Sequence, residues 1–227
     1  MFIYIDDFLI ASANREEHLQ HLKLVFERLH QNGLILNKKK CVFDVEEVQF
    51  LGHCVDKNGI RPLEAKVTAI KECEEPKNMK ELRRYLGMIN FYRRHIPHCS
   101  EILRPLYALL SPKKNSYKKI ALNEEARKAF LEIKDKLSTA SLLAFPRLNA
   151  STRLYTDASM HSVGAALVQL DHSGEPVPIA FFSKNLTETQ KIYSAFDREL
   201  LAVYLAIRHF KYFLEGRKFA VLRTIDP

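Results

Sequence analysis

Hydrophobic residues recur along the chain at two spacings, one typical of strands and the other of helices. Phe2 to Ser12 contains two apolar runs separated by two aspartates, which predicts a strand, a tip and a second strand. Asn14 to His30 repeats its apolar residues every three or four positions and begins with a good N-cap residue, which predicts a helix. Val48 to Ile60 contains the pair Asn58-Gly59, so we predict a hairpin whose turn lies at Lys57, Asn58 and Gly59.

The same patterns predict a helical middle and a mixed last third. Apolar residues keep a helical spacing from Asn78 to Ile96, inside a helical region from Pro62 to about Pro112, and again from Asn123 to Ser138. Strands are expected at residues 153–155, 163–170 and 179–183, then a long helix at 188–214 and a strand at 219–222. Strands covered by one helix are typical of a mixed sheet, so we predict an α+β fold.

Composition adds a localised positive charge to this picture. The 227 residues carry a formal net charge of +8, and 47% of them are hydrophobic, as in a globular chain. The segment from Lys77 to Lys119 contains eleven basic and two acidic residues, so it accounts for the whole excess. Such a segment favours a surface that binds a polyanion, with a solvated helix face as the alternative.

A polar stripe in this segment contains a glycine. Helical steps of three and four place five residues on one face: Lys80, Arg83, Gly87, Asn90 and Arg94. A glycine inside a helix is about 1 kcal/mol less favourable than alanine, so we expect the missing side chain to allow close approach of a partner. A sugar-phosphate backbone and a packed helix both meet this requirement.

Several function classes are excluded by the composition. The 7 glycines form neither GxG nor GxxxxGK, which excludes nucleotide binding by a glycine-rich loop. Apolar stretches are far shorter than the roughly 18 residues of a membrane span, and the N-terminus lacks the basic start of a signal peptide, so we expect no membrane partner. The 4 cysteines never form CxxC, which fits a reducing intracellular compartment.

Two neighbouring aspartates are candidates for metal-dependent chemistry. Adjacent side chains on a strand point to opposite faces, so Asp6 and Asp7 can reach one point only at a hairpin tip. Two like charges at such a tip repel, and a divalent cation relieves the repulsion. A plain polar turn is the alternative.

A second pair of carboxylates lies in the last third of the chain. Glu199 falls on an alanine-rich helix face suited to packing on a sheet, and Asp157 ends a predicted strand of the same region. Two such acids facing each other are the minimum for Mg²⁺-dependent phosphodiester chemistry. A salt bridge from Glu199 to Arg153 or Arg198 is the alternative.

Eight blocks of sequence resemble, in order, part of the polyprotein of gypsy-type long-terminal-repeat retrotransposons. YIDD within FIYIDDFLIAS resembles the metal-binding hairpin of reverse transcriptases, and LNKKKCVF, FLGHCVDKNGIRP, ELRRYLGMINFYRRHIP and RPLYALL follow it. LYTDAS, SKNL and YSAFDRELLAVYLAIRHFKYFLEGRKF resemble the ribonuclease H domain. The resemblance implies a palm remnant with a primer-grip-like hairpin (1–61), a helical thumb (62–120), a connection (121–150) and a truncated ribonuclease H-like domain (151–227).

The resemblance also implies site residues. Asp6 and Asp7 would be catalytic carboxylates that bind Mg²⁺, with Mn²⁺ as a substitute, and Asp157 and Glu199 would be catalytic metal ligands of ribonuclease H. The other implied residues would contact nucleic acid: Tyr4 near the primer end, Lys40 near the departing pyrophosphate, Phe50, Leu51 and Gly52 as the primer grip, and Arg83, Gly87 and Phe91 along the minor groove. The implied partners are an RNA/DNA template-primer duplex, dNTPs and other polyprotein segments, in the cytoplasm, the nucleus or a virus-like particle.

The chain departs from the family pattern at the last strand. The family has TDHKPL after the long helix, whereas this chain has LRTIDP, with Thr224 in place of the third aspartate and Asp226 two positions later as the remaining candidate. A further palm aspartate and the fingers would precede Met1. We therefore expect the family function to be RNA-directed DNA synthesis with hydrolysis of the hybrid's RNA, but little or no polymerase activity from this chain alone. The alternative is a non-catalytic nucleic-acid-binding remnant.

Overall fold

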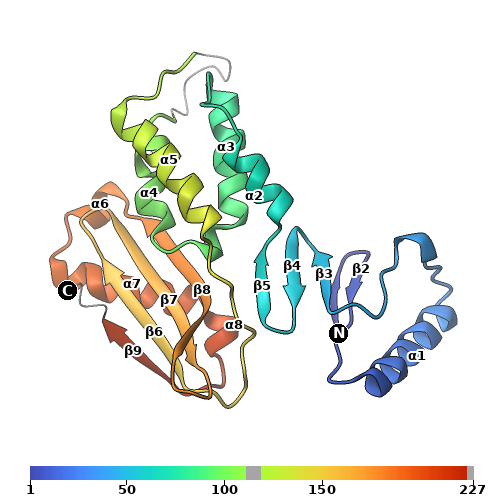
Figure 1. The fold of residues 1–227 in the computed structure, drawn as a ribbon. Helices are drawn as coiled ribbons and strands as arrows, with labels where there is room; N and C mark the ends of the chain where they lie inside the picture. Colours follow the sequence, from blue (N-terminus) through green and yellow to red (C-terminus); the bar gives the residue numbers. More distant parts are fainter. Residues whose placement is uncertain (111–118, 224–227) are drawn as a thin grey trace. The chain divides into compact units, whose positions relative to one another are not determined.

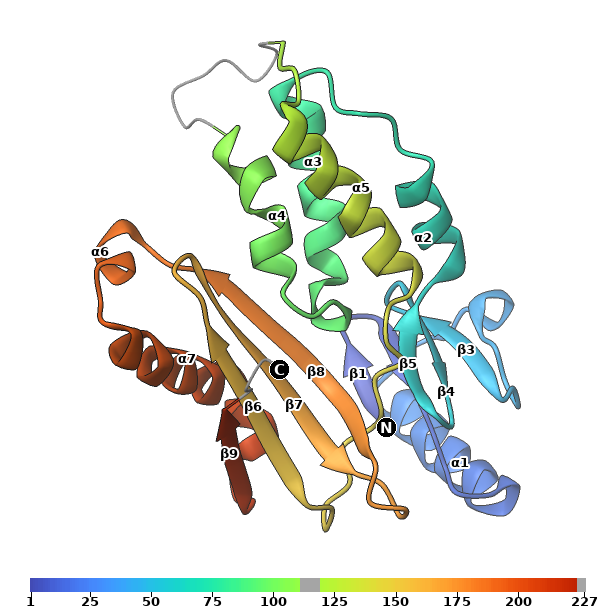
Figure 2. The same ribbon diagram turned by 60° about the vertical axis from the view of Figure 1, so that its left-hand side comes forward.

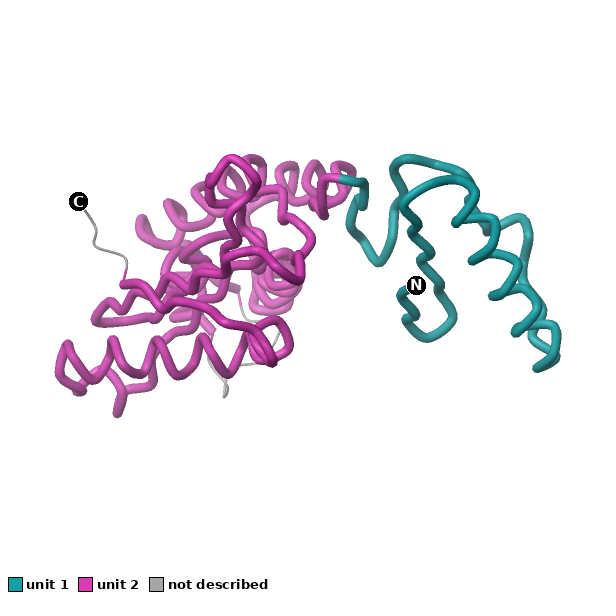
Figure 3. The backbone as a smooth tube through the Cα atoms, turned by 90° about the horizontal axis from the view of Figure 1, so that it is seen from below, with its two compact units in different colours: residues 1–57 teal, residues 58–227 magenta. Residues whose placement is uncertain are grey.

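The structure, a computed structural model, describes residues 1–110 and 119–223. Clustering of the backbone divides the chain into two units, Met1–Lys57 and Asn58–Pro227, which Figure 3 shows in teal and magenta. Asp226, Thr224 and part of the basic segment, residues 111–118, lie outside the described residues. In the part of the chain that is described, no helix has the length and apolar character needed to cross a bilayer.

Unit 1 consists of two hairpins and one helix around very little core. Only Leu29 and Cys54 of its residues are buried. The predicted helix is confirmed, because Asn14 caps it by accepting a hydrogen bond from the backbone N–H of Glu17. In order, the elements are β1 (Phe2–Tyr4), β2 (Asp7–Leu9), α1 (Arg15–Gln31), the 3₁₀ helix η1 (Lys38–Lys40), β3 (Glu47–Phe50) and β4 (His53–Asp56).

The turn predicted at Lys57, Asn58 and Gly59 is confirmed, but the single hairpin predicted at Val48–Ile60 is wrong because this stretch contains two turns. The first turn, Leu51–Gly52, joins β3 to β4, and the second, Lys57–Asn58, precedes β5 (Gly59–Pro62). Glycine is required at position 59 by close packing as well as by the turn. A Cβ atom at Gly59 would lie 2.1 Å from the carbonyl oxygen of Leu143, which accepts a hydrogen bond from Ile60 N–H.

Unit 2 begins with a bundle of helices whose apolar faces share one core. Residues of α3, α4 and α5 form most of this cluster. At its centre the rings of Tyr85 and Phe130 lie 4.7 Å apart, and burial raises the pKa of the tyrosine. The helices are α2 (Glu64–Lys71), α3 (Met79–Phe91), η2 (Arg93–His95), α4 (Cys99–Ala108) and α5 (Glu124–Ser138).

A four-stranded mixed sheet completes unit 2. Its order is β8-β7-β6-β9, antiparallel except for the parallel pair β6–β9. The strands are β6 (Thr152–Ala158), β7 (Ser162–Leu170), β8 (Pro176–Asn185) and β9 (Phe219–Arg223). Helix α7 packs on β6 and β7, whereas α4 packs on β8 (Figures 1 and 2). The predicted α+β class is therefore confirmed.

The single long helix predicted at 188–214 is wrong. It is divided into α6 (Glu188–Lys191), α7 (Ala195–His209) and α8 (Lys211–Leu214). Ser194 starts a new helix because its side chain accepts a hydrogen bond from the backbone N–H of Asp197. This local capping bond competes with continuation of the preceding helix.

Candidate active sites and nucleic-acid interface

The first hairpin presents Asp6 and Asp7 at its exposed end. Tyr4 pairs with Asp7 across the hairpin, so the two-residue turn consists of Ile5 and Asp6, one residue earlier than predicted. Ile5 has a φ of 53°, although a β-branched residue rarely adopts positive φ and glycine is the usual residue there. Such backbone strain is concentrated at functional sites, which favours a role for this turn beyond connecting two strands.

The chemistry of this tip fits a divalent cation. Both aspartates are exposed, and neither forms an ion pair within the described part of the chain. Mg²⁺ is commonly held by one or two carboxylates together with substrate phosphates and water. Among residues 1–110 and 119–223, no group of three or more His, Cys, Asp or Glu side chains is arranged to hold a metal ion. A cation at Asp6 and Asp7 would therefore take its other ligands from outside the described residues.

The second hairpin contacts the first within unit 1. The rings of Phe2 and Phe50 meet edge to face with centroids 6.0 Å apart. The turn that follows has positive φ at both Leu51 and Gly52, the pattern of a tight hairpin turn. Of these turn residues, Leu51 is the strained one because it carries a side chain.

The other nucleic-acid candidates of unit 1 are accessible. Tyr4 ends β1 and is about half exposed, and Lys40 is exposed at the end of η1. The side chain of Asn37 caps η1 by accepting a hydrogen bond from Lys39 N–H. The roles of Tyr4 and Lys40 remain predictions.

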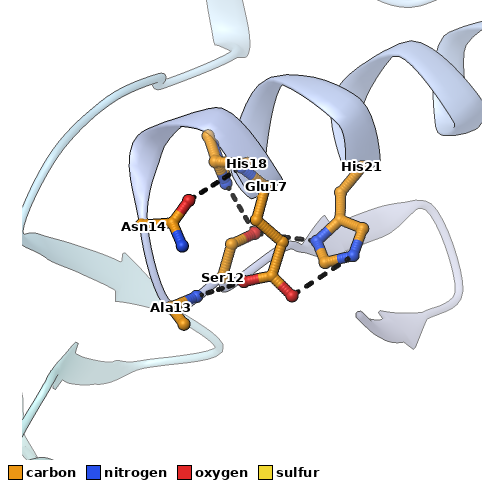
Figure 4. A network of polar contacts seen from close by, with 6 residues as sticks. All are labelled: Ser12, Ala13, Asn14, Glu17, His18 and His21. Atoms are coloured by element: carbon orange, nitrogen blue, oxygen red, sulfur yellow. Dashed lines mark hydrogen bonds and ion pairs between the residues drawn. The ribbon is translucent and has the colours of Figure 1, made fainter.

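A polar network at the start of α1 was not predicted from the sequence. The hydroxyl of Ser12 lies 2.9 Å from Nδ1 of His21 and 3.1 Å from Nδ1 of His18 (Figure 4). Glu17 accepts a hydrogen bond from Ala13 N–H, which completes the capping of the helix. The available signal was an asparagine followed three residues later by a glutamate, the pattern of a capping box. We assign the network to the start of α1, where Asn14 caps the helix and the Ser12 hydroxyl binds the rings of His18 and His21.

The exposed face of α3 is the strongest candidate for a nucleic-acid interface. Lys80, Arg83, Gly87 and Phe91 are all exposed on this helix. A Cβ atom added at Gly87 would meet nothing within 4 Å. No described part of the chain therefore packs on this glycine, which favours an external partner over a packed helix as the reason for its presence.

The predicted helix through Ile96 is wrong, and with it the single face joining Arg83 to Arg94. Helix α3 ends at Phe91 with Tyr92 as its C-cap, and the following η2 ends before Ile96, which Pro97 requires to be extended. Arg94 instead lies in η2, where burial lowers its pKa and its Nε atom is buried without a hydrogen-bond partner. Asn90 donates a hydrogen bond to the Tyr107 hydroxyl at 2.6 Å. Binding of nucleic acid by Asn90 and Arg94 remains a prediction. The hydrogen bond of Asn90 to Tyr107 and the burial of Arg94 argue against it.

The carboxylate of Glu199 is occupied by an arginine. Its Oε1 atom lies 2.9 Å from a guanidinium nitrogen of Arg223, and its side chain is only 20% exposed. The sequence had suggested two other partners, but Arg198 donates a hydrogen bond to the carbonyl of Tyr193 instead, and Arg153 forms no ion pair with Glu199. A carboxylate already paired with a guanidinium does not fit a divalent cation as this site stands.

Asp157 lies near the end of β6, opposite Gly164 of β7. Helix α7, which carries Glu199, packs on both of these strands. Within the described residues no hydrogen bond or ion pair joins Asp157 to Glu199. Their joint action as metal ligands therefore remains a prediction.

Comparison with known families identifies both parts of the chain. Residues 1–55 match the family described as reverse transcriptase (RNA-dependent DNA polymerase), and residues 122–221 match the RNase H-like domain found in reverse transcriptase. The chain joins a reverse transcriptase segment to an RNase H-like domain. Enzymes of both families generally use divalent metal ions.

The relatives of this reverse transcriptase–RNase H chain include retrotransposon polyproteins. It is 34% identical over 222 residues to the retrovirus-related Pol polyprotein from transposon opus of Drosophila melanogaster, which covers 95% of this chain and 22% of that protein. It is also 34% identical over 224 residues to the transposon Tf2-3 polyprotein of Schizosaccharomyces pombe. This alignment covers 99% of this chain and 16% of that polyprotein. The chain thus spans less than a quarter of either polyprotein's length.

Solved structures support the same assignment. The chain is similar to the foamy viral protease-reverse transcriptase in complex with RNA/DNA hybrid, with a TM-score of 0.85 and 26% identity, over 100% of this chain and 30% of that one. A second structure, of the foamy viral protease-reverse transcriptase dRH in complex with double-stranded DNA, gives the same TM-score and identity and is covered to 39%.

Proposed function

We propose that the chain binds a template-primer duplex as part of a retrotransposon RNA-directed DNA polymerase with ribonuclease H. The exposed, basic face of α3 around Gly87 is the observation that carries this proposal. Binding of an RNA/DNA hybrid and of double-stranded DNA by the foamy viral relatives supports it. In this assignment, residues 1–61 are palm, 62–120 thumb, 121–150 connection and 151–227 ribonuclease H-like, in an element of gypsy type.

The hairpins of unit 1 would act at the primer end. Asp6 and Asp7 would hold Mg²⁺ or Mn²⁺, and the ion would neutralise charge on the phosphates of a dNTP. The strained turn at Ile5 holds the aspartates at the exposed end of the hairpin, and the Leu51–Gly52 turn would support the primer strand. We expect little or no polymerase activity from this chain alone, because the described residues provide no third metal ligand at this tip.

A non-catalytic nucleic-acid-binding role is the second candidate. The pairing of Glu199 with Arg223 favours it, because one proposed ribonuclease H ligand is already neutralised. Both candidates place the duplex on α3, and both predict little or no primer extension by this chain alone. Extension of a primed RNA template with Mg²⁺ and dNTPs would contradict the expectation of little polymerase activity. An intracellular setting fits either candidate, since none of the four cysteines, all of them described, forms a disulfide.

Duplex binding tests the proposal directly. Fluorescence anisotropy with a labelled RNA/DNA hybrid, measured in EDTA over a salt series, should show affinity that falls steeply with salt. Arg83→Ala should weaken binding and lower the log-log salt slope by about 0.9 for the lost phosphate contact. Lys128→Ala is the matched control, because it removes the same charge from an exposed position on α5.

Gly87→Leu separates binding from folding. The new side chain would enter open space and replace a poor helix former, so we expect the fold to gain up to about 1 kcal/mol while duplex affinity falls. If Arg83→Ala and Gly87→Leu both bind the hybrid as Lys128→Ala does, α3 is not the interface.

A further inference from the structure

The ion pair at Glu199 joins helix α7 to strand β9 of the RNase H-like sheet. Glu199 projects from α7, and Arg223 ends β9. Strand β9 runs parallel to β6 and places Arg223 opposite Thr156, the residue that precedes Asp157. Arg223 therefore pairs with Glu199, and its backbone lies on the strand next to β6, opposite the residue that precedes Asp157.

Arg223 meets the Glu199 carboxylate as a guanidinium, whose planar fork of N–H donors matches a carboxylate. The Glu199 side chain is only 20% exposed, whereas the Arg223 side chain is 69% exposed, so the pair at 2.9 Å is shielded from water on the carboxylate side alone. A divalent cation that approached Glu199 would have to displace this partner or bind beside it against charge repulsion.

The sequence provides no compensating acid within the described part of β9. The strand ends in Val221, Leu222 and Arg223, without a carboxylate. We propose that Arg223 suppresses divalent-cation binding at Glu199 by neutralising its carboxylate. This inference rests on the assignment of Asp157 and Glu199 within the proposed function, and it is independent of duplex binding by α3.

Metal binding without catalysis tests the proposal. The 227-residue chain carrying Asp6→Asn and Asp7→Asn, which removes the aspartates of the hairpin, is titrated with Mn²⁺, and free Mn²⁺ is followed by electron paramagnetic resonance. Adding Arg223→Ala should tighten Mn²⁺ binding by about tenfold, because a positive charge next to the carboxylate is lost. Arg223→Lys keeps the charge and should leave binding weak.

Two further variants test whether the gain in Mn²⁺ binding arises at Glu199. Lys218→Ala removes an equal charge about 16 Å away along the strand, beyond the screening length at 0.1 M salt, and should change binding less than twofold. Glu199→Gln added to Arg223→Ala should abolish the gain. Circular dichroism checks folding, and Arg223→Gln replaces Arg223→Ala if the smaller side chain disturbs β9.

Each other outcome overturns the proposal. It fails if the chain with Arg223 intact binds Mn²⁺ as tightly as Arg223→Ala, if neither Arg223→Ala nor Arg223→Gln tightens binding, or if the gain survives Glu199→Gln. Hybrid binding in EDTA, measured on the same variants, shows separately whether the proposed function stands.

Discussion

The two units of the chain differ in how much of their apolar surface is buried. Unit 1 buries only Leu29 and Cys54, and large side chains such as Ile35, at 96%, are exposed. Unit 2 contains a core shared by three helices and a second one under α7. Three of the four non-glycine residues with positive φ in the described chain, Ile5, Asp44 and Leu51, lie in unit 1. The candidate metal-binding hairpin thus lies on strained turns with little core, whereas α3, Asp157 and Glu199 lie in the unit that contains most of the buried apolar residues.

The largest contrast is expected from removing one aromatic ring in each unit. Phe130→Ala in unit 2 should lower the free energy of unfolding by about 3–5 kcal/mol, because its ring is 2% exposed and contacts Tyr85. Phe26→Ala in unit 1 should cost about 1 kcal/mol or less, because this ring is 39% exposed and contacts only the edge of Phe43 among the described rings. Urea unfolding followed by circular dichroism, with hydrogen exchange to resolve the units, measures both. Equal losses would contradict the comparison.

A smaller effect is expected from the polar contact between helices and sheet in unit 2. The guanidinium of Arg93 donates hydrogen bonds to the Ser100 hydroxyl at 2.9 Å and to the carbonyl of Ser183 on β8. Arg93→Ala should lower the free energy of unfolding by about 2 kcal/mol, because it leaves a buried acceptor unpaired. Amides of β8 should then exchange faster. Arg84→Ala, an exposed control on α3, should change stability by less than about 0.5 kcal/mol; a similar loss in both variants would rule out a specific role for the contact.

The smallest effect concerns the pH dependence of unit 2. His209 stacks on Phe182 with ring centroids 4.5 Å apart, and its pKa is lowered from 6.5, first by burial and then by the charges of Arg93 and Arg94. The unfolded chain therefore binds the proton more readily. The stability contributed by neutral His209 is complete above about pH 6.5 and is lost as the pH falls through the lower folded-state pKa.

Thermal unfolding between pH 7.5 and 5 measures this dependence. His209→Gln should flatten the curve below pH 6.5 relative to the unmodified chain, since the glutamine does not titrate. The prediction is wrong if both proteins lose stability by the same amount over this interval.

Sequence reasoning succeeded where short-range interactions decide the structure. Asn14 and Asn123 were recognised as helix starts because an N-cap bond spans only three residues. The exposed hairpin at Asp6 and Asp7 was predicted in the same way, although its turn lies one residue earlier. The end of α3 at Phe91 was missed because the apolar spacing continues beyond it to Ile96.

The sequence by itself determined where most helices begin, most strands, the basic face of α3 and the identity of the candidate carboxylates. These features follow from periodicity, caps and motifs along neighbouring residues. Only the tertiary structure decided which partner each charged group has. It brought Arg223 to Glu199, turned Arg94 inward and tied Arg93 to Ser183. The physical reason is that an ion pair forms between residues far apart in sequence, and strand pairing and helix packing decide which of many arginines reaches a given carboxylate.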